Sequence, residues 1–167
     1  MERKSSLRLL TVSALLMAAN IMMSSIGLPV PGGHIYLNDV IIDTAALLLP
    51  PFWAFAVGGI GSFLGDLFFY PTPMFVSLVT HGLQAVVISL CVRRSPDHPK
   101  RGGILGVTLG AFIMVVGYSL GRAFLYATPA AAWLKLPYQI LQAAVGAVAS
   151  IVLCFRFGLK NRFDKTH

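Results

Sequence analysis

Charged residues are scarce in this 167-residue chain: only 11% are Asp, Glu, Lys or Arg, whereas 56% are hydrophobic. The mean hydropathy of +0.77 is too high for an ordinary soluble domain. Six acidic residues stand against thirteen Lys and Arg, a net charge of +7. In a soluble protein this excess would suggest nucleic-acid binding. Here the basic residues cluster between apolar runs, as orientation signals do, so we expect a membrane protein without a nucleic-acid partner.

Motifs that carry chemistry are equally scarce. The two cysteines, Cys91 and Cys154, lack metal-ligand spacing, and we interpret them as free packing thiols. No G-x-x-x-x-G-K-[ST] loop occurs, so the chain has no ATPase motif of its own. No paired catalytic motif is present either. We therefore expect a chain without catalytic residues, without a metal site and without a bound cofactor.

Six apolar runs predict an all-α integral membrane protein with a single domain over residues 1–167. A bilayer core of ~30 Å needs ~20 helical residues. The predicted spans cover about 9–26, 35–50, 52–69, 74–92, 104–126 and 133–156. The second reaches spanning length only if Ile35–Asp39 is included. As a buried stub it would leave five spans and put the two termini on opposite sides.

The distribution of basic residues favours six spans. With six spans, one side of the membrane receives Arg3, Lys4, Arg8, Arg93, Arg94, Lys100, Arg101, Arg156, Lys160, Arg162 and Lys165. Lys135 alone lies in an outer loop, and Arg122 lies inside a span. By the positive-inside rule, both termini of this multi-pass protein of the cell membrane are cytoplasmic. The first apolar run is long for a signal peptide, so we expect it to be retained.

Polar residues gather in the outer half of the predicted bundle. Such groups are costly inside a membrane, so they tend to face the bundle interior and mark function. The candidate substrate-binding residues are Asn20, Asp39, Asp43, His81, Gln84, Tyr118, Arg122, Tyr138, Gln139 and Gln142. Nearby aromatic residues suit an interfacial belt, although one or two could stack on a flat ring: Tyr36, Phe69, Tyr70, Tyr126 and Trp133. This depth pattern predicts a pocket open to the outside above a closed apolar floor.

Several of these residues have structural alternatives. Asn38 and Asp39 could cap the start of a helix, and His81 could be a hydrogen-bonded core residue. Asp66 lies near a helix C-terminus, where the dipole disfavours it, and Arg122 lies at matching depth. We therefore expect a structural Asp66–Arg122 ion pair in preference to direct ligand contact by both residues. An Arg122 free of Asp66 would favour a carboxylate and point toward pantothenate.

Small residues form a stripe on the first span. Ala14 and Ala18 share a face roughly opposite Ser13, Asn20 and Ser24. The polar stripe should face inward, which turns the alanines outward toward lipid or a partner. Small residues at this spacing let another helix approach closely. The glycine pairs of later spans are interpreted as internal packing.

Several segments together carry a resemblance to a known family. They are Ala14-x-x-x-Ala18, the stretch from Gly32-Gly33-His34 through Asn38-Asp39 to Gly58-Gly59-Ile60-Gly61 and Gly65-Asp66, and the run from Pro73 to His81-Gly82. With six spans, the chain resembles the substrate-binding S components of energy-coupling factor (ECF) vitamin transporters over nearly its whole length. The middle segment looks most like members assigned to pyridoxine or the hydroxymethylpyrimidine moiety of thiamin.

The resemblance implies high-affinity capture of a small vitamin from outside the cell. It also implies that a membrane coupling subunit docks on the alanine face, and that two ABC-type ATPase subunits use ATP. Two other classes stay open. A stand-alone ion-coupled secondary carrier could use Asp39, Asp43 and Asp66, but none of them lies near the bilayer midplane. An intramembrane enzyme could use His81 with the aspartates, but no paired motif supports it.

Overall fold

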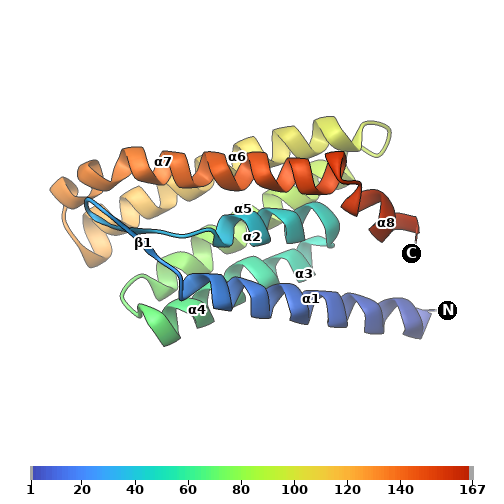
Figure 1. Ribbon diagram of the computed structural model, residues 1–167, viewed down its shortest axis with the longest axis horizontal. Helices are drawn as coiled ribbons and strands as arrows, with labels where there is room; N and C mark the ends of the chain where they lie inside the picture. Colours follow the sequence, from blue (N-terminus) through green and yellow to red (C-terminus); the bar gives the residue numbers. More distant parts are fainter. Residues whose placement is uncertain (1, 166–167) are drawn as a thin grey trace.

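The computed structural model describes residues 2–165 as a bundle of helices that run roughly along one axis (Figure 1). The helices are α1 (Glu2–Ser24), α2 (Asn38–Leu48), α3 (Pro51–Phe55), α4 (Gly61–Phe69), α5 (Met74–Arg93), α6 (Pro99–Gly121), α7 (Pro129–Ile151) and α8 (Leu159–Lys165). Three π-helical segments, η1 (Ala56–Ile60), η2 (Arg122–Tyr126) and η3 (Val152–Arg156), continue the helices before them. Strands β1 (Leu28–Val30) and β2 (Gly33–Ile35) form an antiparallel hairpin.

Five helical segments of the described chain are long and apolar enough to cross a membrane: Ser6–Ser24, Pro51–Phe69, Met74–Arg93, Pro99–Tyr126 and Pro129–Arg156. This agrees with the expected all-α membrane protein. α2 is not among them, because it has only 11 residues. Nearly all of its side chains are buried, so α2 is an interior helix that packs between α5 and α7.

α2 is shorter than the sequence predicted. We expected a span from about residue 35, but Ile35 lies in β2 and the helix begins at Asn38. The reason is the turn before it. Gly32 and Gly33 have positive φ values of 82° and 141°, conformations that glycine adopts readily and other residues rarely. The chain therefore forms a hairpin where we expected the approach to a helix.

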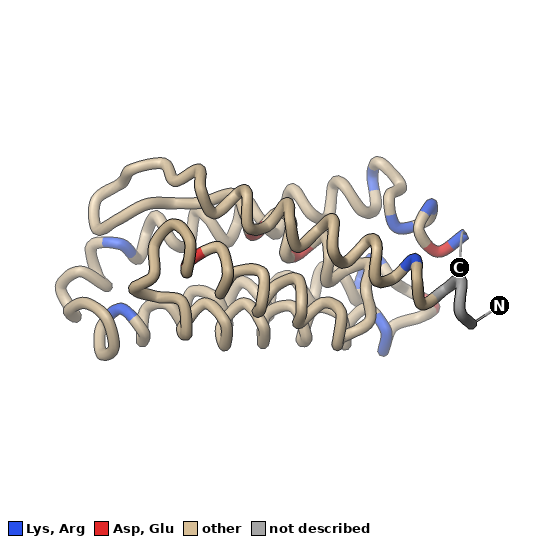
Figure 2. Tube along the Cα trace, turned by 90° about the horizontal axis from the view of Figure 1, so that it is seen from below, with Lys and Arg blue, Asp and Glu red and all other residues tan. Residues whose placement is uncertain are grey.

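The start of α1 and the C-terminal helix α8 nevertheless lie at the same end of the bundle (Figure 1). The chain returns through the bundle partly as β2 and the extended segment after it, and partly as α2. The stub alternative required that a short buried α2 put the two termini on opposite sides. In the structure α2 is short and buried, and α1 nevertheless begins at the same end of the bundle as α8. Most Lys and Arg residues lie at this terminal end (Figure 2), whereas Arg122 and Lys135 bond to hairpin carbonyls at the opposite end.

The exposure pattern of α1 matches its predicted orientation. Ser13 is 3% exposed, whereas Ala14 and Ala18 are exposed on the outer face. A Cβ atom added at Gly61 would lie 2.8 Å from Asn20 Nδ2, and one at Gly65 would lie 2.5 Å from Ser24 Oγ. These glycines let α4 approach the polar stripe of α1, which confirms their role in internal packing.

The apolar core surrounds α2 and extends toward the terminal end. Its largest fully buried side chains include Ile42, Leu47, Val57 and Ile88. Cys154 belongs to this core, and both cysteines are free thiols. The buried polar residues of α2, which are Asn38, Asp39, Asp43 and Thr44, lie in its first two turns, and its last residues are apolar. Since the two ends of α2 differ in this way, the polar site and the apolar core are stacked along the bundle axis.

Candidate ligand-binding site

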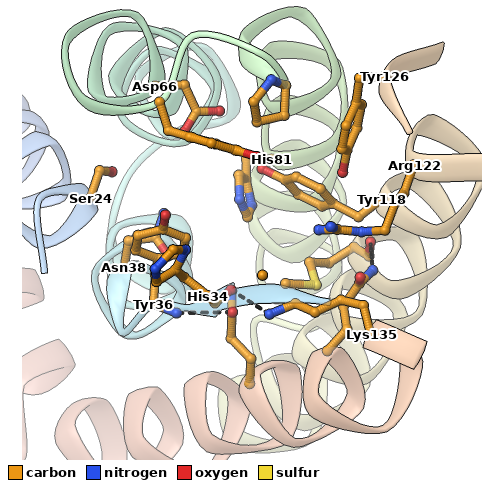
Figure 3. Close-up of a pocket in the computed structure, with 16 residues that line it drawn as sticks. Ser24, His34, Tyr36, Asn38, Asp66, His81, Tyr118, Arg122, Tyr126 and Lys135 are labelled. Carbon is orange, nitrogen blue, oxygen red and sulfur yellow. Dashed lines mark hydrogen bonds between the residues drawn. The ribbon is translucent and has the colours of Figure 1, made fainter. Parts of the chain in front are cut away.

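A pocket lies at the hairpin end of the bundle, between β2, α5, η2 and α7 (Figure 3). Its lining residues are Ser24, Gly33, His34, Tyr36, Asn38, Asp66, Tyr70, Pro73, His81, Met114, Tyr118, Arg122, Tyr126, Lys135, Gln139 and Gln142. Polar and aromatic side chains dominate this wall. Such a mixture suits a small polar ligand with a flat or partly apolar body.

Two basic side chains hold the hairpin over the pocket. Arg122 Nη1 donates a hydrogen bond to the carbonyl of Gly32 at 2.8 Å, and Lys135 Nζ donates to the carbonyl of His34. Gly32 also packs directly on Lys135, since a Cβ at Gly32 would lie 3.1 Å from Lys135 Cβ. The hairpin that covers the pocket is therefore attached to η2 and α7 through Arg122 and Lys135, which also line the pocket.

A hydrogen-bonded layer of amides and carboxylates lies behind the pocket wall. Gln142 Nε2 donates to Asp39 Oδ2 at 2.6 Å, and Gln142 Oε1 accepts from the backbone N–H of Tyr36 at 3.0 Å. Gln84 Nε2 donates to Asp43 Oδ1 at 2.8 Å and to Asp39 Oδ1 at 3.2 Å. Buried polar groups need such partners. This layer therefore fixes α2 against α5 and α7.

His81 connects this layer to the pocket. Its Nδ1 is 2.8 Å from Gln84 Oε1 and 3.7 Å from Asp39 Oδ1. Its ring centroid lies 5.2 Å from that of Tyr118. Since both rings line the pocket, together they offer aromatic surface to a flat ligand.

Asp66 and Arg122 do not form the expected ion pair in the structure. The Asp66 carboxylate accepts a hydrogen bond from the Ser77 hydroxyl, which also contacts the Tyr118 hydroxyl. Arg122 binds the Gly32 carbonyl instead. Both residues line the pocket, but the hairpin brings a backbone acceptor to the guanidinium, and this acceptor replaces the carboxylate.

The structure divides the ten candidate substrate-binding residues into two groups. Those that line the pocket are His81, Tyr118, Arg122, Gln139 and Gln142. Those outside the lining are Asn20, Asp39, Asp43, Gln84 and Tyr138. Asn20 joins α1 to the following helices, because its Nδ2 donates to the carbonyl of Val57 at 2.8 Å and to Ser62 Oγ at 3.2 Å.

The capping alternative does not describe α2. Its N-cap residue is Leu37, and no side chain caps the helix by a hydrogen bond. Both Asp39 oxygens accept from glutamine amides instead. Asn38 lines the pocket, and its Oδ1 is buried without a hydrogen-bond partner among the described residues.

Lys135 is the main pocket residue that our sequence analysis placed elsewhere. We counted it as an outer-loop cation, although our last predicted span began at about residue 133. In the structure α7 begins at Pro129, and Thr128 Oγ1 caps it by accepting from the Ala131 N–H at 3.3 Å. Thr-Pro is a recognisable helix start, so this signal was available. Lys135 lies within the helix and is only 2% exposed.

Three of the predicted belt tyrosines line the pocket: Tyr36, Tyr70 and Tyr126. Trp133 instead is 74% exposed on the outer surface. Burial raises the pKa of Tyr36, and negative charge from Asp66 adds to the shift. The Tyr36 phenol therefore stays protonated at neutral pH and can donate a hydrogen bond.

Comparison with known proteins places this architecture in a family. A family model described as "ECF-type riboflavin transporter, S component" matches residues 4–158. A Pyrococcus woesei protein described as "Uncharacterized protein in gap 3'region" is 29% identical over 133 residues, which cover 78% of this chain and 88% of that protein. The match confirms the expected ECF S component, whereas the pyridoxine or hydroxymethylpyrimidine subgroup stays a prediction. The chain belongs to the ECF-type riboflavin transporter S-component family, membrane transport subunits that select the substrate in vitamin uptake, are not enzymes, and associate with ECF membrane and ATPase subunits.

Proposed function

We propose that this chain captures a small water-soluble vitamin or vitamin precursor in the hairpin-end pocket, as the substrate-specificity subunit of an ATP-driven ECF importer. The observation that carries the proposal is the stacking of a polar pocket on an apolar core. His81, Gln139 and Gln142 are buried and line the pocket, whereas Leu47 and Leu49 close the bundle toward the other end. A ligand therefore binds in a dead-end site, and its release inward depends on movement with the partner subunits.

The charge distribution supports an outward-facing pocket. Most Lys and Arg residues lie at the terminal end of the bundle, opposite the hairpin (Figure 2). Under the positive-inside rule this end is cytoplasmic. Both termini then face the cytoplasm, and the hairpin and pocket face the exterior, where a vitamin is captured.

Three ligand chemistries are candidates. The sequence resemblance favours pyridoxine or hydroxymethylpyrimidine, whose flat rings suit the aromatic surface of His81 and Tyr118. Pantothenate is next, and Arg122 supports it because this residue has no pairing with Asp66. The description of the matching family adds riboflavin as a further candidate.

Binding to the purified protein tests the proposal. Calorimetry with pyridoxine, hydroxymethylpyrimidine, pantothenate, riboflavin and thiamin should show saturable binding of at least one compound. Replacing His81 with Ala should weaken it, because the ring lines the pocket. Thr108→Val is the matched control, since Thr108 is exposed and bonds only to its own helix. No binding by any vitamin or precursor would overturn the proposal.

We also propose that Ala14 and Ala18 form the docking face for the ECF membrane subunit. Both are exposed in the structure, on a helix whose polar stripe is turned inward. Small side chains at this spacing permit close helix contact. The two alanines lie near the middle of α1, and neither of them lines the pocket.

A stand-alone ion-coupled carrier is the second candidate, because Asp39 and Asp43 are two buried carboxylates. Their hydrogen bonds to Gln84 and Gln142 support a structural role instead. Reconstitution of the single chain in liposomes separates the two functions. Vitamin uptake driven by an ion gradient without partner subunits would favour the carrier.

A further inference from the structure

We infer that the ligand of this pocket carries an anionic group, a carboxylate or a phosphate, which binds among Arg122, Tyr126 and Lys135. The inference rests on the proposed function, because it assigns a substrate class to the same pocket. The three side chains lie on one side of the pocket (Figure 3). We call them the cationic corner.

Two basic side chains lie in this corner without an acidic partner. Lys135 is 2% exposed and Arg122 is partly buried. Among residues 6–165, whose side chains the structure describes, no carboxylate oxygen lies within 4.0 Å of either cation. Each cation donates a hydrogen bond to a hairpin carbonyl. Burying a cation without a counter-ion is costly, and an anion on the ligand would supply that counter-ion.

Two further donors in the corner have no partner among the described residues. Arg122 Nε and the Tyr126 hydroxyl are both buried and unbonded. The guanidinium carbon lies 5.4 Å from the centre of the Tyr126 ring. Buried donors are normally satisfied, and the planar guanidinium presents donors that match carboxylate and phosphate geometry. Their convergence on one pocket wall indicates a missing acceptor.

The acidic groups that the structure describes do not fill this role. Among them, Asp66 alone lines the pocket, and Ser77 donates to it. Asp39 lies behind the wall, and both of its oxygens accept from glutamine amides. The aromatic surface of His81 and Tyr118 lies elsewhere on the same wall. A ligand with a polar or ring-shaped body and one anionic end would place its body against His81 and Tyr118 and its anionic group in the cationic corner.

Matched ligand pairs test the inference, because their members differ at one group. Calorimetry on the purified full chain would compare pantothenate with pantothenol, pyridoxine 5′-phosphate with pyridoxine, and riboflavin 5′-phosphate with riboflavin. In at least one pair the anionic member should bind about tenfold tighter or more, the range of a charge-assisted hydrogen bond. The first pair reports a carboxylate ligand and the other two report a phosphate ligand.

Variants of the cationic corner then assign the preference to its residues. Arg122→Gln and Lys135→Met each remove a hairpin anchor, so binding of both members should weaken, but the dissociation constant of the preferred anionic member should rise about tenfold more than that of its neutral counterpart. Tyr126→Phe removes a single oxygen and should give a smaller loss with the fold intact. Arg93→Gln is the control, because Arg93 is an exposed cation at the end of α5 far from the pocket.

The outcomes separate the inference from the proposed function. Equal or tighter binding of the neutral member in every pair would overturn the inference while the vitamin-capture function stands. An equal loss for both members in Arg122→Gln and Lys135→Met would also overturn it, because those residues would then only anchor the hairpin. No binding by any member of any pair would count against the capture function itself, and the inference would fall with it.

Discussion

Gln142 donates its side-chain amide to Asp39 across 2.6 Å, which ties the middle of α7 to the first turn of α2. The carbonyl oxygen of the same side chain accepts from the backbone N–H of Tyr36 at 3.0 Å. One residue therefore positions both the buried helix and the end of the hairpin. Since Gln142 also lines the pocket, the shape of the site depends on the same contacts that hold the bundle together.

Gln142→Leu should destabilise the protein by about 1–3 kcal/mol, because a buried carboxylate oxygen and a backbone N–H both lose a partner. Ligand binding should weaken as well, since the hairpin loses an anchor. Thermal unfolding in detergent micelles measures the first effect and calorimetry the second. Thr108→Val, which removes an exposed hydroxyl, should change neither. An unchanged melting temperature in Gln142→Leu would contradict the role of this side chain.

Gly146→Ala should separate α7 from α2. A Cβ at Gly146 would lie 2.5 Å from Asp39 Cβ and 3.2 Å from the Asp39 backbone carbon. Overpacking of this kind costs about 1–3 kcal/mol, and the displacement should lengthen the Gln142–Asp39 hydrogen bond. Ala144→Leu adds a larger group at an exposed position of the same helix and serves as control. Equal melting temperatures for the two variants would show that α2 can shift freely.

Asp66→Asn and Arg122→Gln should have additive effects on stability. The two side chains have different partners, Ser77 and Gly32, and uncoupled sites add within about 0.5 kcal/mol. A double-mutant cycle followed by thermal unfolding measures the coupling. A coupling clearly larger than this limit would restore the ion pair that matching depth suggested.

Ala14→Phe and Ala18→Phe should abolish assembly with the ECF membrane subunit and vitamin uptake, because a bulky ring prevents close helix approach. Ligand binding by the isolated chain should stay unchanged, since neither alanine lines the pocket. Co-purification of the complex, uptake in cells and calorimetry measure the three properties. Ala144→Phe, on an exposed face of α7, should leave all three unchanged. Normal assembly of the Ala14 and Ala18 variants would remove this face from the docking surface.

Features that depend on helical periodicity could be predicted from the sequence, whereas features that depend on a turn or on an exact helix start were missed. The inward orientation of Ser13 and the outward orientation of Ala14 were predictable, because helical periodicity assigns residues to faces. The hairpin was not predicted, although two consecutive glycines before His34 marked a turn. Lys135 was counted with an outer loop because it lies close to the predicted start of the last span at about residue 133, whereas Thr128 and Pro129 start α7 earlier.

The sequence by itself determined that the chain is a helical membrane protein with polar residues gathered toward one end. Hydropathy and residue spacing suffice for this, because they report the cost of each side chain in lipid and its depth along a helix. Only the tertiary structure decided which of these polar residues line the pocket. Depth does not specify direction across the bundle, and buried hydrogen-bonding groups pair with the nearest acceptor available. For Arg122 that acceptor is the carbonyl of Gly32, which reaches the guanidinium only because the hairpin folds back over the pocket.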